Sequence, residues 1–302
     1  MSEQMQQYPQ PEPRGSGRRE KKGNWMGKVA LLCSVLALIL AGTALFLVFW
    51  EKPPKTFQYR DMTLEAIKDV PVNQYDPEGF YLDEQGRVRY QKDGREAKAG
   101  IDVSFYQGEI DWQAVAADGV EFAIIRLGYR GYTEGGLRLD SRFAENIQGA
   151  LDAGLEVGVY FFSQAITPQE AEEEAAFVAE ALEPYEITYP VVFDWEFITP
   201  RGQARTDTME GEQLTETALA FCNAVSQEGY TPMVYFNQEM GYFTYDLAKL
   251  KEVPFWLAEY DTKPDFYYHF DLWQYTHTGT VAGIEGSVDW NLDFQPVLEE
   301  SE

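Results

Sequence analysis

The chain has 302 residues, enough for one large or two ordinary domains, and 45% of them are hydrophobic, which favours a folded core over a disordered chain. Asp and Glu total 50 against 24 Lys and Arg, a net charge of −26, which argues against a nucleic-acid partner because phosphate binding needs a basic surface. With only two Cys and two His, a Cys/His zinc cluster and a disulfide scaffold are nearly excluded. We expect neither a metal ion nor another cofactor.

The N-terminal part of the chain predicts a membrane anchor. Residues 1–28 carry six basic and three acidic residues, and residues 29–50 carry no charge at all. At about 1.5 Å per residue this run spans roughly 33 Å, close to the thickness of a bilayer core. The positive-inside tendency predicts a disordered cytosolic tail over 1–28, a transmembrane helix over 29–50 ending at Trp50, and an exported remainder. A cleaved signal peptide is the alternative, although its apolar core is usually shorter.

Residues 51–98 predict an extracytoplasmic stalk, because they contain Pro53-Pro54, scattered charges and few apolar runs. One short hairpin is expected within it, from residues 79–82 to 88–90, with its turn at residues 83–86.

From residue 99 onward, apolar runs of strand length alternate with helical patterns. The predicted strands cover residues 100–105, 122–128, 156–163, 189–196, 232–237, 255–260, 271–276 and 286–291. The predicted helices cover residues 111–118, 141–153, 167–182 and 212–227, with a short one near Leu247. This order predicts a parallel sheet closed into a barrel over residues 99–295, in which the last helices are reduced or missing, followed by a tail over 296–302.

The helix predicted from residue 167 shows a recognisable start. Thr167 is a capping residue, Pro168 suits the first helical position, and Glu170 is expected to return to the cap. The following Glu172, Glu173 and Glu174 are most simply interpreted as a solvated face.

Acidic residues lie at the predicted strand ends. In Phe193-Asp194-Trp195-Glu196 the two carboxylates share one face of the strand, and the aromatic residues share the other. Asp102 and Asp289 alternate with apolar residues in the same way, and barrel enzymes carry their chemistry at the C-terminal ends of the strands. We therefore expect Asp102, Asp194, Glu196 and Asp289 to meet at one mouth, although a bound divalent cation is an alternative use of such a cluster.

Two carboxyl groups in a cleft suit glycoside hydrolysis, in which one donates a proton to the leaving oxygen and the other stays ionised. Their i, i+2 spacing is compatible with both retaining and inverting stereochemistry. Side chains near the strand ends are the candidate sugar contacts: Tyr160, Phe162, Tyr235, Asn237, Trp256, Tyr260, Trp273 and Arg126.

At this point the sequence resembles the family 25 glycoside hydrolases, the muramidase-type lysozymes. The resemblance covers about residues 99–294 and rests on five segments in order: Gly-Ile-Asp-Val-Ser at 100, Phe-Ala-Ile-Ile-Arg-Leu-Gly at 122, Phe-Asp-Trp-Glu at 193, Trp-Gln-Tyr at 273 and Val-Asp-Trp-Asn at 288. It implies a (β/α)5(β)3 TIM-like barrel that cleaves the β-1,4 bond between N-acetylmuramic acid and N-acetylglucosamine in peptidoglycan. By position, Glu196 resembles the general acid, and Asp194 resembles a partner that steadies the substrate N-acetyl group or acts at the sugar carbon. Asp102 and Asp289 resemble the two further acids.

The leading hypothesis is thus a monomeric muramidase domain, held outside the cell membrane by residues 29–50 in the lipid bilayer. A chitinase-like hydrolase is a second interpretation, although such enzymes usually carry a further Asp where this chain has Val192. A catalytically silent glycan-binding module is a third.

Overall fold

The computed structural model describes residues 25–49 and 55–298, and the chain divides into two compact units, Met1–Thr56 and Phe57–Glu302. In the first unit, helix α1 (Trp25–Phe49) covers most of the segment predicted to span a membrane. Among the described residues, however, no helix is long and apolar enough to cross a bilayer, so the predicted span is not confirmed. Residues 1–24 of the predicted tail and Trp50 lie outside the described residues.

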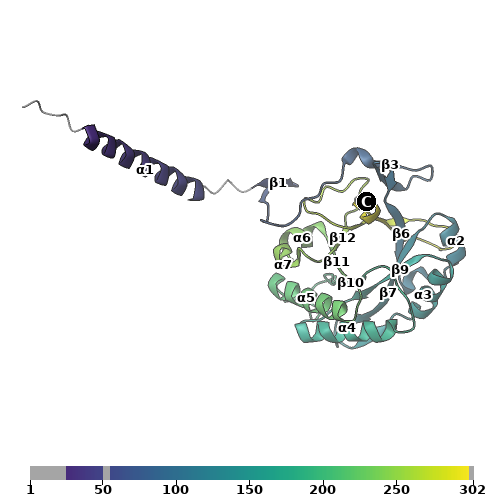
Figure 1. Ribbon diagram of the computed structural model, residues 1–302. Helices are drawn as coiled ribbons and strands as arrows, with labels where there is room; N and C mark the ends of the chain where they lie inside the picture. The colour runs from purple at the N-terminus through teal and green to yellow at the C-terminus, as the bar shows by residue number, and fades with distance from the viewer. Residues whose placement is uncertain (1–24, 50–54, 299–302) are drawn as a thin grey trace, which may run out of the picture. The chain divides into compact units, whose positions relative to one another are not determined.

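Eight strands of the second unit form a closed barrel in the order β6-β14-β13-β12-β11-β10-β9-β7, with β7 pairing back to β6 (Figure 1). They are β6 (Lys98–Val103), β7 (Phe122–Arg130), β9 (Glu156–Phe162), β10 (Val191–Asp194), β11 (Pro232–Asn237), β12 (Phe255–Ala258), β13 (Leu272–Gly279) and β14 (Val288–Asp293). A short strand, β8 (Leu137–Leu139), pairs with the end of β7. All eight predicted strands are therefore confirmed.

Helices follow the first five barrel strands and are missing between the last three, as predicted. They are α2 (Trp112–Ala117), α3 (Phe143–Asp152), α4 (Pro168–Leu182), α5 (Gly211–Gln227), α6 (Gln238–Phe243) and α7 (Leu247–Leu250). The short helices η2 (Phe105–Gln107) and α8 (Gln295–Leu298) complete the unit, and α8 occupies the start of the tail predicted for residues 296–302.

The last strand departs from the predicted all-parallel sheet. β14 runs antiparallel to both β13 and β6, whereas the other barrel neighbours are parallel. The physical reason is the connection: residues 280–287 are too few for a crossover helix, and a parallel return needs a dozen residues or more. The chain therefore turns back and closes the barrel with a hairpin.

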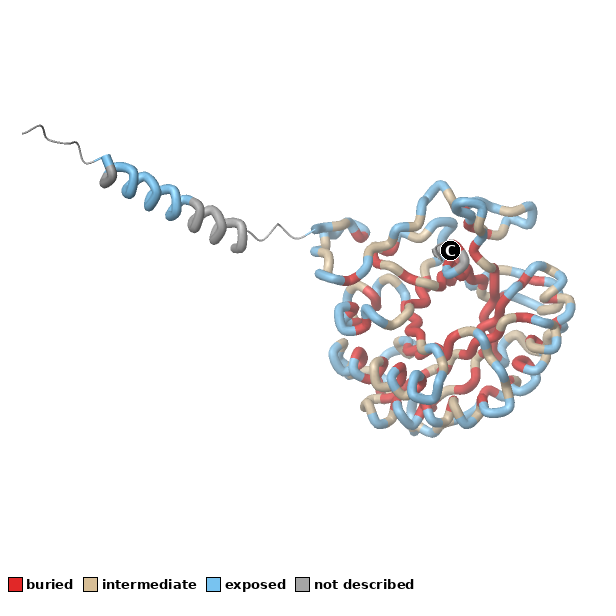
Figure 2. The backbone as a smooth tube through the Cα atoms, in the orientation of Figure 1, coloured by how far each residue is buried: buried red, intermediate tan, exposed pale blue. Residues whose placement is uncertain are grey.

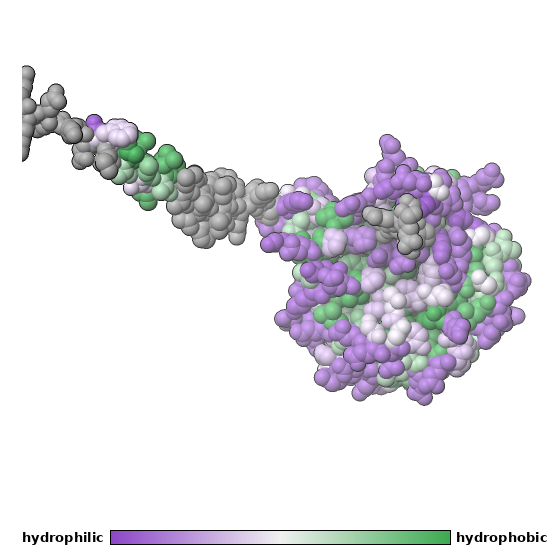
Figure 3. Space-filling view, in the orientation of Figure 1, coloured by the Kyte–Doolittle hydropathy of each residue, from purple (hydrophilic) through white to green (hydrophobic). Residues whose placement is uncertain are grey.

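Side chains of the strands alternate between two apolar layers. Phe193 points outward and meets Phe221 of α5 with ring centroids 5.3 Å apart, while Val192 belongs to a smaller cluster inside the barrel. Buried residues accordingly trace the ring of strands, and exposed ones lie on the outer helices (Figure 2). Hydrophilic side chains dominate the face of this unit seen in Figure 3.

Residues 57–97, most of the segment predicted to be a stalk, pack against the barrel and belong to the same compact unit. They contain β1 (Thr56–Tyr59), β2 (Met62–Glu65), η1 (Pro77–Gly79), β3 (Phe80–Leu82), β4 (Val88–Lys92) and β5 (Arg95–Glu96). The predicted hairpin is confirmed as the antiparallel pair β3–β4. Tyr75 stacks on Phe294 at 4.1 Å, and Phe80 and Tyr90 are buried, because this segment carries aromatic residues that need a partner surface.

Candidate active site

A polar cavity of about 180 Å³ opens at one end of the barrel. All four predicted acids line it, although they come from three strands and lie nearly a hundred positions apart in sequence. The remaining lining residues are Tyr160, Tyr235, Trp256, Tyr260 and Gln274.

Asp289 lies at this mouth, as predicted, but its position on its strand differs from the predicted one. It lies near the N-terminal end of β14, not at a C-terminal end. Because β14 runs antiparallel, its N-terminal end adjoins the C-terminal ends of the parallel strands, and Asp289 pairs in register with Asp102 of β6. The antiparallel return thus brings a fourth carboxyl group to the site.

Asp102 and Asp289 form a hydrogen-bonded carboxyl pair. The Oδ2 atom of Asp102 also accepts hydrogen bonds from the side-chain amides of Gln274 and Asn291, each at 2.8 Å. Burial raises the pKa of Asp102 well above its ordinary value, and the neighbouring Asp289 raises it further. Burial likewise raises the pKa of Asp289 to about 6, so the pair retains a proton in mildly acidic solution.

Asp194 ends β10, and Glu196 follows it beyond the strand, with both side chains at the cavity. Burial raises the pKa of Asp194, and the carboxyl groups of Glu196 and Asp102 raise it further. The surrounding protein, which partly desolvates the carboxyl group, and then Asp102 raise the pKa of Glu196, although this residue remains exposed at the mouth of the cavity. Among the described residues, no donor lies within hydrogen-bond reach of Asp194 Oδ1, although that atom is buried. A buried carboxylate oxygen without a donor is costly, which makes it a natural acceptor for a ligand N–H or O–H.

Four of the predicted sugar contacts line the cavity. Tyr235 and Trp256 meet edge to face at 4.8 Å, and Tyr160 approaches Trp256 at 6.4 Å. Tyr260 is 52% exposed and stands at the rim. These rings leave flat apolar surfaces and hydroxyl groups around the acids, a combination suited to a sugar ring.

The other four predicted contacts lie outside the cavity. Trp273 is fully buried and points outward, where its ring meets Phe80 at 5.6 Å, because alternation along β13 turns Gln274 inward and Trp273 outward. Asn237 is exposed and caps α6 by accepting a hydrogen bond from Met240 N–H. Phe162 is half-buried beside Asp194 on the neighbouring strand.

Arg126 is the fourth of these. Its guanidinium pairs with Asp140 at 2.7 Å and lies over the ring of Phe105 at 5.0 Å. It is still near enough to lower the pKa of Asp194, against the larger effect of burial. Arg126 therefore contributes charge to the site without lining the cavity.

Gln274 and Asn291 are site residues that the sequence analysis missed. Gln274 accepts hydrogen bonds from the hydroxyls of Tyr235 and Tyr260 at 2.9 and 3.0 Å, and Asn291 accepts one from Trp256 Nε1 at 2.8 Å. Together they connect the Asp102 carboxyl to the aromatic rings. Both alternate with outward-facing aromatic residues, so the strand period that selected the acids could also have selected them.

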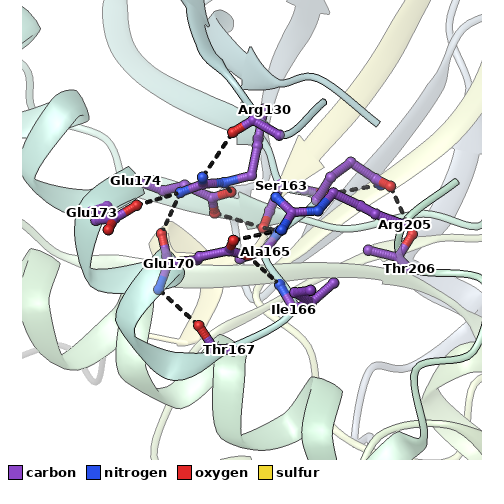
Figure 4. Close-up of polar contacts among 12 residues, drawn as sticks. Arg130, Ser163, Ala165, Ile166, Thr167, Glu170, Glu173, Glu174, Arg205 and Thr206 are labelled. Carbon is purple, nitrogen blue, oxygen red and sulfur yellow. Dashed lines mark hydrogen bonds and ion pairs between the residues drawn. The ribbon is translucent and has the colours of Figure 1, made fainter. Parts of the chain in front are cut away.

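A second polar network lies beside the site, where β7, β9 and α4 meet (Figure 4). Glu174 of α4, predicted to be solvated, is fully buried and accepts hydrogen bonds from Arg130 Nε at 2.7 Å and Ser163 Oγ at 2.6 Å. Burial raises the pKa of Glu174 to about 7, while Ser163 and Arg130 act to lower it. The prediction of a solvated face was wrong for this residue: Glu174 lies on the apolar side of α4, and the prediction followed its charge and not its position on the helix.

The network continues into the loop that follows Glu196. The predicted cap is confirmed for Thr167, which accepts a hydrogen bond from Glu170 N–H, but the Glu170 carboxylate binds Ile166 N–H instead of the cap residue. Arg205 of the loop pairs with Glu170 at 2.5 Å. Gln164 donates to the backbone oxygen of Glu196 at 3.5 Å and accepts from Thr206 Oγ1 at 2.7 Å. The backbone of Glu196 and the loop that follows it are thus held by this network.

The described residues contain no group of three or more His, Cys, Asp and Glu side chains arranged to hold a metal ion. The chemistry that the cavity offers through its own side chains is proton transfer between buried carboxyl groups and hydrogen bonding to a bound ligand.

Comparisons with known proteins find similar chains among proteins named as lysozymes. The chain is 29% identical over 192 residues to the autolytic lysozyme of Clostridium acetobutylicum, covering 63% of this chain and 54% of that protein. It is 29% identical over 203 residues to lysozyme M1 of Streptomyces globisporus, covering 64% and 66%. The matches thus span about half to two thirds of the length of these curated relatives.

Solved structures show the same fold. The modular autolysin LytC of Streptococcus pneumoniae, in complex with a synthetic peptidoglycan ligand, matches with a TM-score of 0.57 and 25% identity over 70% of this chain and 56% of that one. The bacterial lysozyme of Streptomyces coelicolor matches with a TM-score of 0.52 and 26% identity, over 64% and 90%. The sequence profile of glycosyl hydrolases family 25 matches residues 101–284, and the chain belongs to that family.

Proposed function

We propose that this chain is a muramidase that hydrolyses the β-1,4 bond between N-acetylmuramic acid and N-acetylglucosamine in peptidoglycan. The observation that carries the proposal is the gathering of four carboxyl groups with raised pKa values around one polar, aromatic-lined cavity. The relatives named as lysozymes, and the related autolysin solved with a peptidoglycan ligand, support the choice of substrate.

In this proposal, Glu196 is the general acid. Its raised pKa keeps the carboxyl group protonated at higher pH, so that it can donate to the leaving glycosidic oxygen. The carboxyl group of Asp102 favours the same state, because two nearby carboxyl groups resist a double negative charge.

Asp194 is the partner acid. Its unpaired Oδ1 atom faces no protein donor among the described residues, and the substrate acetamido N–H is a group of the right chemistry to bind it. In that position the carboxylate would orient the acetamido oxygen toward the sugar carbon. Direct attack by Asp194 at that carbon is the alternative. Both routes invert the sugar carbon twice and retain its configuration, so a trapping experiment separates them: a covalent sugar–Asp194 adduct, detected by mass spectrometry with a slow fluorinated substrate, would indicate direct attack.

The charge of the Asp102–Asp289 pair can change during the reaction, because the two carboxyl groups share a proton. One proton between the two carboxyls limits the repulsion in the empty site, and the positive charge that develops on the sugar would favour its loss. Gln274 and Asn291 hold Asp102 in place through this change.

The decisive experiment measures release of reducing ends from purified peptidoglycan, with mass spectrometry of the products. We expect Glu196→Gln to lower the rate by about 10²–10⁴-fold, the usual contribution of a positioned acid. Glu172→Gln, the same change at an exposed position of α4, should leave the rate unchanged. Full activity of Glu196→Gln would reject the assignment of the acid, and faster turnover of chitin than of peptidoglycan would reject the substrate.

We further propose that residues 29–50 tether the domain to the outer side of the cytoplasmic membrane. The support is in the sequence: 22 residues without a charge, preceded by a segment of net charge +3. A chain shortened to begin at residue 57 should lose its sedimentation with membranes, keep its activity on purified peptidoglycan and act less efficiently on intact cells, because tethering raises local concentration. Equal sedimentation of both forms would contradict the tether.

A further inference from the structure

A groove of about 870 Å³ adjoins the catalytic cavity on the side of the β3–β4 hairpin. The hairpin forms one wall through Leu82, Gln85 and Arg87, and the end of β13 forms the other through Thr276 and Thr278. The volume falls in the range of pockets that hold organic ligands. The hairpin lies outside residues 101–284, so this wall is not part of the segment that matches the family.

The hairpin wall is held firmly against the barrel. The Asp83 carboxylate accepts hydrogen bonds from the backbone N–H groups of Gln85 and Arg87 at 3.0 and 2.8 Å, and Gly86 completes the turn at a φ of 78°. Arg87 pairs with Asp118 at 2.5 Å and lies 4.5 Å from the centre of the Trp290 ring. A wall with these contacts is organised before a ligand arrives, which lowers the entropy cost of binding.

Tyr260 joins the groove to the catalytic cavity, because it lines both. Its hydroxyl donates to Gln274 inside the cavity, and its ring meets His277 of the groove with centroids 4.4 Å apart. A polymer with one repeat at the acids would therefore pass Tyr260 and enter the groove.

The lining of the groove fits a sugar chain better than a charged peptide. Threonine hydroxyls and the Gln85 amide offer uncharged donors and acceptors, and the Tyr260 ring offers a flat apolar face. The carboxylate of Asp261, which also lines the groove, already accepts hydrogen bonds from Thr262 N–H and Oγ1. The guanidinium of Arg87 is already neutralised by Asp118, so it is not available to a peptide carboxylate. Hydroxyl and acetamido groups need partners of this uncharged kind.

We propose that this groove binds the continuation of the glycan strand that is cleaved in the adjoining cavity. The proposal rests on the proposed function, and it assigns to the N-terminal hairpin a role in binding long strands. It predicts that the protein prefers long glycan strands over short ones, and that this preference depends on the groove.

The test measures binding by calorimetry in the full chain carrying Glu196→Gln, so that no strand is cut. The ligands are a dodecasaccharide and a single disaccharide repeat of peptidoglycan, whose lactyl carboxyls are capped as amides. The groove variant is Gln85→Leu with Thr278→Leu, which adds apolar bulk and removes the polar groups. The matched control is Ser226→Leu with Gln227→Leu at exposed positions near the end of α5.

We expect the groove variant to lose about tenfold in affinity for the dodecasaccharide and nothing for the disaccharide, whereas the control loses affinity for neither. Unchanged affinity for the long strand would overturn the proposal, and so would a loss seen only with a free stem peptide. Thermal melting of each variant identifies one that fails to fold, and Gln85→Leu and Thr278→Leu singly then repeat the comparison. The muramidase function is tested separately: if the unmutated chain releases no reducing ends, that function is rejected. The binding measurement tests only the groove, because it does not depend on turnover.

Discussion

Replacing Asp289 with Asn should make the unfolding free energy of the protein decrease less as the pH rises. The ordinary aspartate pKa of 3.8 rises to about 6 in the folded chain, a change of about 2.2 units. At 1.36 kcal/mol per unit this corresponds to at most about 3 kcal/mol of unfolding free energy. Asp289 keeps some contact with solvent, so screening lowers the expected effect to about 2 kcal/mol.

The sign follows from which state binds the proton more tightly. The folded state holds the Asp289 proton up to about pH 6, whereas the unfolded chain releases it near pH 3.8. The contribution of this group to stability is therefore complete below the unfolded pKa and is lost as the pH rises through the folded one. An asparagine carries no titrating proton, and its amide can donate to Asp102 at every pH.

Urea unfolding between pH 3.5 and 7.5 measures this difference. We expect the unfolding free energy of the variant, relative to that of the original chain, to increase by about 2 kcal/mol between pH 3.5 and pH 7.5. Asp61→Asn, the same change in the exposed β1–β2 turn, is the control and should run parallel to the original chain. Loss of Asp289 also lowers the pKa of Asp102, and this change acts in the same direction, so a constant offset between Asp289→Asn and the original chain would refute the reasoning.

Three further changes test the packing and the polar networks. Arg130→Met leaves the buried Glu174 carboxylate without its cation, so we expect a loss of about 3–5 kcal/mol at pH 8 and a smaller one at pH 5, measured by urea unfolding; equal losses would contradict it. Gln274→Leu removes the partner of Asp102 and of two tyrosines, and kcat/KM on soluble peptidoglycan fragments should fall by at least about tenfold, whereas unchanged kinetics would exclude its positioning role. Trp195→Ala empties a fully packed position between β10 and the outer layer and should cost about 3–5 kcal/mol in urea unfolding; a cost below about 1 kcal/mol would contradict the outward packing.

Much of the barrel could be predicted because strand and helix periods are local properties. The alternation in Phe193-Asp194-Trp195-Glu196 predicts two carboxyls on one face and two rings on the other, and the structure has that arrangement. The same rule applied to residues 272–275 would have identified Gln274 and excluded Trp273, which was chosen for its aromatic character instead.

The errors concern residues whose environment depends on distant segments. Glu174 lies on the apolar face of α4, but the burial of its carboxyl group depends on Arg130 and Ser163, which come from distant segments. Residues 57–97 lack long apolar runs, yet their aromatic side chains find partners on the barrel and join its compact unit.

The sequence by itself determined which segments form strands and helices, which face of each strand carries the acids, and the family to which these motifs point. Only the tertiary structure decided that β14 returns antiparallel, that Asp289 therefore faces Asp102, and that a hairpin far upstream forms the wall of a groove beside the cavity. The reason is physical: periodicity reflects the side-chain directions within one element, whereas strand direction and closure depend on connection length and on contacts between residues far apart in the chain.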